Sequence, residues 1–198
     1  MVSVQAGDRA AALDYIEQGL ELATGELRAE AYLRTGRGLL SQSPGNHDVA
    51  LRHFRQAAEP ARRCDARTPE LRALTGLAES SLRLGRHGEA GEHAQTARAL
   101  ATASGYRLFE ARSFALLAEL DLARGGFERA ARRANRALGI QTEAGHRIGR
   151  AETLLVLGHA LRQAGDEGGT LRAWAQALEV YESLGAGRRH EVRALMGR

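Results

Sequence analysis

Glycine recurs along this chain at a fixed spacing, and this regularity limits the possible folds more than any other feature. Two series share a 40-residue period, and one is offset from the other by half of it. Their members are Gly45, Gly85, Gly125 and Gly165, and Gly25, Asp65, Gly105, Gly145 and Gly185. Glycine just past a helix adopts φ > 0 without a Cβ penalty, and aspartate is one of the few residues that tolerate this conformation. The two series therefore predict nine helix ends at regular intervals of half a period.

The segments between these positions have helical patterns. Leu154, Leu157 and Leu161 follow one another at spacings of three and four, and so do Trp174, Ala177 and Tyr181. Such spacings give one apolar face per helix. Each 40-residue unit is therefore predicted to be a pair of antiparallel helices. Neighbouring pairs must stack, because a single pair cannot bury both apolar faces.

Equivalent positions of successive units hold related residues. One column is uniformly small, with Ala57, Ala97, Ala137 and Ala177. Another varies in size, with Phe54, Ala94, Ala134 and Trp174. Small residues let helices approach closely, so we expect the small members of the second column to face bulkier neighbours.

Composition supports an all-α protein that lies in the cytoplasm. Good helix formers dominate, only three prolines occur, and arginine supplies all of the positive charge because lysine is missing. A net charge of +4 is far from the basic stripe of a dedicated nucleic-acid binder. Cys64 is the only cysteine, so no internal disulfide can form. The N-terminus has no apolar signal core, and no apolar run approaches the roughly 18 residues of a membrane span.

The segment from Leu154 to Asp166 reads Leu-x-x-Leu-Gly-x-x-Leu-x-x-x-Gly-Asp and is followed by Thr170, Trp174 and Ala177. This pattern resembles the tetratricopeptide repeat, although the 40-residue unit is longer than the usual one of about 34 residues. The resemblance implies a right-handed α-solenoid of antiparallel helix pairs that binds protein ligands. The long units, the arginine-alanine-rich texture and the ending Glu191 to Met196 resemble the C-terminal solenoids of large bacterial transcriptional activators, of the antibiotic-regulatory and large ATP-binding LuxR types.

We expect one repeat domain over residues 1–198. It comprises a lone second-type helix at 8–23, full units at 26–65, 66–105, 106–145 and 146–185, and the start of a further helix at 187–197. Arg34 and Arg37 stand where later units have leucine, which predicts that the first helix of the first unit is out of phase and that Ser41 to His47 forms a longer turn. A solenoid that begins within a repeat predicts an uncovered apolar face. We therefore expect either a fragment of a longer protein or self-association through that end.

The chain offers little catalytic chemistry, and we predict no enzymatic activity, no cofactor and no metal site. Without lysine it cannot contain a phosphate-binding Gly-x-x-x-x-Gly-Lys-[Ser/Thr] loop, and no Gly-x-Ser-x-Gly elbow occurs. His87 and His93 lie six positions apart, so they do not share a helix face as metal ligands would. His47 and His53 occupy the same columns one unit earlier, which favours packing. Cys64 has no histidine beside it, and Trp174 is expected to anchor the core.

The first helices of tetratricopeptide units line the concave groove, and the resemblance implies three sets of groove residues here. They are Arg72, Thr75, Glu79 and Arg83; Arg112, Ala115, Glu119 and Leu122; and Glu152, Leu155, His159 and Arg162. Arg72 and Arg112 lie one unit apart and could clamp a carboxylate or phosphate. The alternative interpretation is that these are solvated surface charges.

We interpret the chain as a protein-interaction or regulatory scaffold, the sensory or interaction module of a bacterial transcriptional regulator. Its expected partners are a protein or peptide ligand or other domains of the same parent protein, without membrane contact and without direct nucleic-acid contact. Two alternatives stay open. One is a nucleic-acid-binding helical repeat that uses Arg132, Arg133, Arg136, Arg188 and Arg189, although no helix-turn-helix signature accompanies them. The other is an accessory domain of a larger enzyme.

Overall fold

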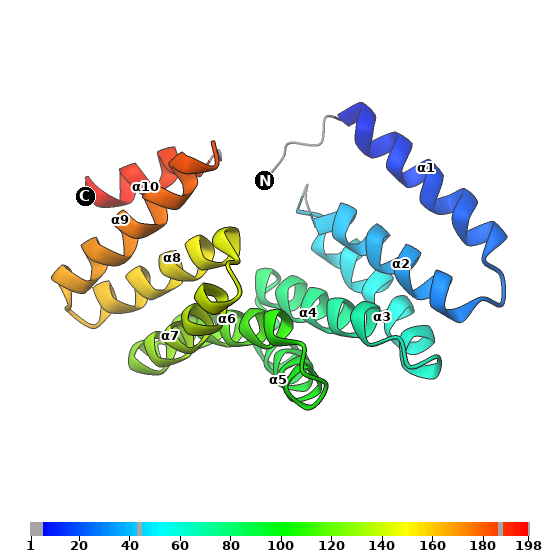
Figure 1. Cartoon of the computed structure of the whole chain (residues 1–198), viewed down its shortest axis with the longest axis horizontal. Coiled ribbons are helices and arrows are strands. Elements are labelled where there is room, and N and C mark those ends of the chain that lie inside the picture. Colours follow the sequence, from blue (N-terminus) through cyan, green and yellow to red (C-terminus); the bar gives the residue numbers. More distant parts are fainter. Residues whose placement is uncertain (1–5, 43–44, 186–187, 198) are drawn as a thin grey trace. The chain divides into compact units, whose positions relative to one another are not determined.

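The computed structural model describes residues 6–42, 45–185 and 188–197, and these residues fold entirely into helices and short turns. Figure 1 shows successive helices running antiparallel as hairpins. The helices are α1 (Ala6–Leu22), α2 (Leu27–Gln42), α3 (His47–Arg63), α4 (Arg67–Arg83), α5 (His87–Ala103), α6 (Arg107–Ala123), α7 (Phe127–Glu143), α8 (Arg147–Gln163), α9 (Glu167–Ser183) and α10 (Arg189–Met196). The all-α repeat architecture predicted from the glycine series is confirmed.

The helices form two compact units. The N-terminal unit contains α1 to α5, and the C-terminal unit contains α6 to α10. Within each unit, helices pack mainly against their neighbours in the chain, as in α2 with α3 and α8 with α9. First helices of adjacent pairs also meet, α2 with α4 and α6 with α8. The prediction of a single repeat domain over residues 1–198 stays a prediction.

The nine predicted helix ends all have left-handed backbone. The eight glycines have φ between 62° and 87°, and Asp65 has φ of 54°. Each turn closes with hydrogen bonds back to the last turn of the helix, for example from the Arg86 amide to the Ser81 carbonyl oxygen at 2.8 Å. These bonds satisfy carbonyl groups that a helix end leaves without partners. The periodic glycines thus act as helix stops.

Side-chain volume is balanced between neighbouring helices. Phe54 of α3 is fully buried, and Gly38 of α2 and Gly76 of α4 make room for its ring. Trp174 of α9 lies against Gly158 of α8 in the same way. In the C-terminal unit the position of Phe54 is taken by Ala134, and its cluster includes Val156, which stands where Gly76 does in the N-terminal unit. The large members Phe54 and Trp174 thus lie against glycines. The expectation that the small members of this column face bulkier neighbours stays a prediction.

The prediction that the first helix of the first unit is out of phase is wrong. Thr35 and Gly38 are buried at the positions that Thr75 and Ala78 occupy in α4. Arg37 substitutes for leucine because its neighbour is polar: its guanidinium donates to Glu17 of α1 at 2.8 Å. The predicted longer turn includes residues 43–44, which lie outside the described residues.

Candidate interaction surface

The predicted groove residues of the N-terminal unit lie along α4. Arg72 and Arg83 are exposed, and Glu79 is half-buried. Thr75 is buried, and its hydroxyl donates to the carbonyl oxygens of Leu71 at 2.9 Å and Arg72 at 3.1 Å. The hydroxyl of Thr75 is therefore committed to its own helix, which leaves the charged side chains as the exposed part of this set.

In the C-terminal unit two predicted groove residues from different pairs meet. Arg112 of α6 donates to Glu152 of α8 at 3.4 Å, although 40 residues separate them. The two side chains are 31% and 41% exposed. Ala115 and Leu155 are buried, whereas Glu119 and Leu122 are half-buried. The first helices of this unit therefore present a mixed-charge row above an apolar floor.

The other predicted residues of α8 gather around Trp174. The imidazole of His159 meets the indole edge-on, with ring centroids 5.4 Å apart. The guanidinium carbon of Arg162 lies 5.2 Å from the centroid of the indole, a cation–π arrangement. Trp174 is 2% exposed, which confirms the expectation that it anchors the core. It also holds the two polar side chains at the surface.

Helix α10 and Arg188, the residue before it, add side chains to this surface that sequence reasoning did not place there. Arg188 donates to both carboxylate oxygens of Glu191 at 2.9 and 3.1 Å. Its guanidinium carbon lies 5.9 Å from the ring centroid of the buried Tyr181. The i, i+3 spacing of Arg188 and Glu191 indicates a local pair. The contact with Tyr181 depends on how α10 docks.

The electrostatics of this cluster follow from partial burial. Desolvation, with Arg162 and Arg188 nearby, lowers the pKa of His159, and Glu191 only partly opposes this. Desolvation also raises the pKa of Tyr181. The hydrogen bonds from Arg188 lower the pKa of Glu191. At neutral pH the surface therefore carries a neutral imidazole between charged guanidinium and carboxylate groups.

Acidification is expected to weaken the C-terminal unit through His159. Its folded-state pKa lies below the ordinary value of 6.5, so the unfolded chain binds the proton more readily. Stability is then complete above about pH 6.5 and declines as the pH falls below this value. Urea unfolding followed by the fluorescence of Trp174, the only tryptophan, at pH 7.5 and 5.5 measures the loss. His159→Gln should reduce it, and an unchanged pH dependence would contradict this assignment.

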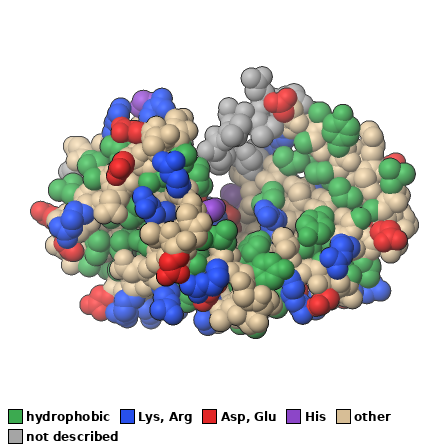
Figure 2. Space-filling view, viewed as in Figure 1, with side chains coloured by type: hydrophobic (Ala, Val, Ile, Leu, Met, Phe, Trp, Pro, Cys, Tyr) green, Lys and Arg blue, Asp and Glu red, His purple; other side chains and the backbone are tan. Residues whose placement is uncertain are grey.

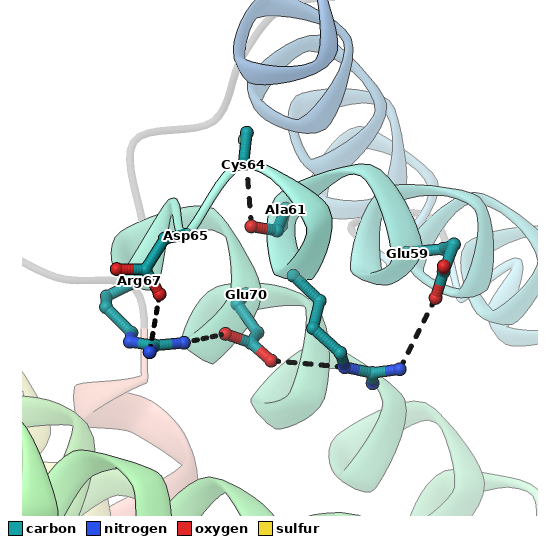
Figure 3. A network of polar contacts seen from close by, with 7 residues as sticks. Glu59, Ala61, Cys64, Asp65, Arg67 and Glu70 are labelled. Carbon is teal, nitrogen blue, oxygen red and sulfur yellow. Dashed lines mark hydrogen bonds and ion pairs between the residues drawn. The ribbon is translucent and has the colours of Figure 1, made fainter.

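A buried carboxylate at the turn between α3 and α4 has a structural explanation (Figure 3). Glu70 pairs with Arg67 at 3.0 Å and with Arg62 at 3.5 Å, and Asp65 also pairs with Arg67. Arg107 and Glu110 repeat the Arg67–Glu70 pair one unit later, also at 3.0 Å. Cys64 lies in the same turn, with its thiol 3.7 Å from the Ala61 carbonyl oxygen. Because the same arginine–glutamate pair recurs at the start of α6, we interpret it as stabilising the first turn of a helix.

The histidine-rich stretch of α5 forms no metal centre among the described residues. Glu89 instead accepts from Arg55 of α3 at 3.1 Å. Burial lowers the pKa of His93 and that of His53. Nor does the described part of the chain contain a helix with the length and apolar character that crossing a bilayer requires.

The arginines considered for nucleic-acid binding are mostly engaged within the chain. Arg133 pairs with Asp121 at 2.7 Å, and Arg132 pairs with Glu128 at 3.7 Å. Arg188 pairs with Glu191, and Arg189 donates to the Gly185 carbonyl oxygen. Figure 2 shows arginine and acidic side chains interspersed on the visible surface. This pattern differs from the continuous basic face that phosphate backbones favour.

Comparisons with known proteins agree with this geometry. Residues 69–143 match the family model of the tetratricopeptide repeat. The chain is similar to the crystal structure of BtubC (BKLC) from P. vanneervenii, with a TM-score of 0.71 and 19% sequence identity. The similarity covers 96% of this chain and 91% of that chain, and at this identity it shows the fold alone. No curated protein matches the sequence. Residues 69–143 are thus similar to tetratricopeptide repeats, and the chain has a tetratricopeptide-type α-solenoid fold.

Proposed function

We propose that this chain is a protein-interaction module, the sensory or interaction part of a bacterial transcriptional regulator that acts in the cytoplasm. Tetratricopeptide repeats generally mediate protein–protein interactions, and residues 69–143 match that family. The arginine-alanine-rich texture and the 40-residue period support the regulator assignment. The ligand would be a protein or peptide, or another domain of the same parent protein.

The observation that carries this proposal is the set of polar side chains that the first helices hold within each unit. Arg72 and Glu79 on α4 have their equivalents at Arg112 and Glu119 on α6. The side chain of Arg112 is only 31% exposed and is held against Glu152. Arginine offers a rigid fork of donors, so a partner carboxylate can replace or share the Glu152 contact with little additional ordering. Recognition would use such contacts together with apolar burial, without bond-making chemistry.

The proposal is tested with the chain as bait in a host lysate and mass spectrometry as readout. A second bait carries Arg72→Glu and Arg112→Glu, and a third carries Arg132→Glu on the exposed side of α7 as a matched control. We expect a protein captured by the wild type and by the control, and reduced at least roughly tenfold by the groove variant.

The other outcomes are equally informative. Capture of the same protein by all three baits would support the interaction function but contradict the assignment of binding to the groove residues. Recovery of nucleic acid alone, with binding that falls steeply as salt rises, would replace the proposal with the nucleic-acid alternative.

A further inference from the structure

The face of the α1–α2 hairpin carries an exposed apolar patch. It consists of Tyr15 and Leu22 on α1, which are 73% and 87% exposed, and Tyr32 and Leu39 on α2, which are 49% and 39% exposed. Single exposed apolar side chains need no explanation, but a contiguous group often marks a site of association. We call these four residues the α1–α2 patch.

The packing between the helices places all four residues on one side of the hairpin. Ile16 and Gly19 of α1 meet Gly36 and Leu33 of α2. Tyr15 and Leu22 are two helical turns apart and lie about a quarter of a turn from this contact line. Tyr32 and Leu39 have the same spacing and the same offset on α2. Because the helices are antiparallel (Figure 1), equal offsets point to the same side.

Contact pairs also set the level of each residue along the hairpin. Ile16 lies opposite Gly36 and Gly19 opposite Leu33. Along the hairpin axis, Tyr15 therefore lies at nearly the same height as Leu39. Leu22 lies at nearly the same height as Tyr32. The result is a two-helix strip with an aromatic and an aliphatic side chain at each level. Such a strip fits the apolar stripe of one more helix.

The charged residues around the patch indicate which charges a docked partner helix should carry. Asp14 and Glu21 are exposed about another quarter-turn around α1, beyond Tyr15 and Leu22. Helix α1 has four acidic residues and one arginine, in a chain whose net charge is +4. Glu17, on the opposite flank, is already paired with Arg37.

We propose that the α1–α2 patch docks an amphipathic helix from a protein partner whose apolar stripe is bordered by lysine or arginine. The basic border lies over Asp14 and Glu21. The other border is neutral or acidic, because Arg28 lies one turn before Tyr32 on α2. This inference rests on the proposed interaction function and names the class of partner. The α2 half of the patch occupies the columns of Arg72 and Glu79 one unit earlier, whereas its α1 half lies outside those columns.

A second copy of the chain is a poorer occupant. In a two-fold contact between α1 helices, Tyr15 of one copy could meet Leu22 of the other, since both interfaces are identical. The same symmetry would place Asp14 beside Glu21 of the other copy. Like charges brought together at an interface oppose association.

The test uses three fluorescein-labelled synthetic peptides, each designed as a helix of about five turns. The first has a leucine stripe bordered by lysines, the second has glutamates instead of lysines, and the third is a scrambled version of the first. Anisotropy measures their binding to the full chain and its variants. Two variants address the patch, Tyr15→Ser with Leu22→Ser, and Asp14→Lys with Glu21→Lys. Leu108→Ser with Leu171→Ser removes two exposed leucines elsewhere as a matched control, and circular dichroism verifies folding.

The lysine-bordered peptide should bind the wild type and the leucine control equally. It should bind both patch variants at least roughly tenfold more weakly. The Asp14→Lys, Glu21→Lys variant should instead prefer the glutamate-bordered peptide. Equal binding of all three peptides, absence of binding, or unaltered binding by the patch variants would overturn the proposal.

Two further measurements separate this inference from the groove proposal. Binding that is lost in Arg72→Glu, Arg112→Glu but kept in the patch variants would favour the groove and overturn the α1–α2 site. Sedimentation that shows a dimer dissociated by Tyr15→Ser with Leu22→Ser would assign the patch to a second copy and overturn the basic-helix proposal. A wild-type monomer is the expected result.

Discussion

Leucine in place of Gly76 is expected to destabilise the N-terminal unit by about 3 kcal/mol, the upper range for overpacking a core. A Cβ atom added at Gly76 would lie too close to the ring of Phe54, in steric overlap with Cζ, Cε2 and Cε1. Gly38 also lies close to the ring, because a Cβ there would be 2.6 Å from Phe54 Cε1. Phe54 is fully buried and cannot move toward solvent. Urea unfolding followed by far-ultraviolet circular dichroism measures the change.

A second substitution should rescue this variant. Phe54→Ala alone leaves a cavity and is expected to cost about 3–5 kcal/mol. Combined with Gly76→Leu, it reproduces a small residue near a larger one, as with Ala134 and Val156 in the C-terminal unit. The double variant should therefore be at least about 1 kcal/mol more stable than the sum of the single effects. If the losses in unfolding free energy were additive, the side chains at positions 54 and 76 would not be competing for the same space.

Removing both arginines that face Asp121 is expected to destabilise the C-terminal unit by about 3 kcal/mol. Asp121 of α6 is 3% exposed, and it pairs with Arg129 at 3.0 Å and with Arg133 at 2.7 Å, both from α7. The Arg129→Met, Arg133→Met variant keeps two long side chains but leaves the carboxylate buried without a cation. The partial exposure of the arginines places the expected loss at the lower end for a broken buried pair. Thermal and urea unfolding at pH 7 measure it.

Helix α7 contains a residue suitable for a control variant, and the next unit indicates a substitution that should restore stability. Arg132→Met removes an exposed pair with Glu128 and should change stability by less than about 0.5 kcal/mol. The next unit has Leu161 where this one has Asp121. Adding Asp121→Leu to the two methionines should therefore restore much of the lost stability, since an apolar replacement of a buried ion pair is often neutral. A triple variant as unstable as the double would refute the charge argument.

Much of the candidate surface could be assigned by shifting residues through the 40-residue period. This places Arg112 and Glu152 in one row, and the structure brings their side chains together. The period says nothing about Arg188 and Tyr181, because their contact depends on how α10 docks on α9. The α1–α2 patch was also not predicted from the 40-residue period. Tyr32 and Leu39 occupy the positions that hold Arg72 and Glu79 in the next unit, so a search for recurring charges passes over them.

The sequence by itself determined where the helices end and which residues share a column. Both properties are local: the left-handed turns at Gly85 and Asp65 follow from backbone sterics, and the columns follow from the helical period. The out-of-phase prediction for α2 failed because it treated the positions of Arg34 and Arg37 as core. Only the tertiary structure showed that Glu17 of α1 supplies a charged partner there. Ion pairing and volume matching depend on which side chains face one another across two helices, and this is decided when the helices dock.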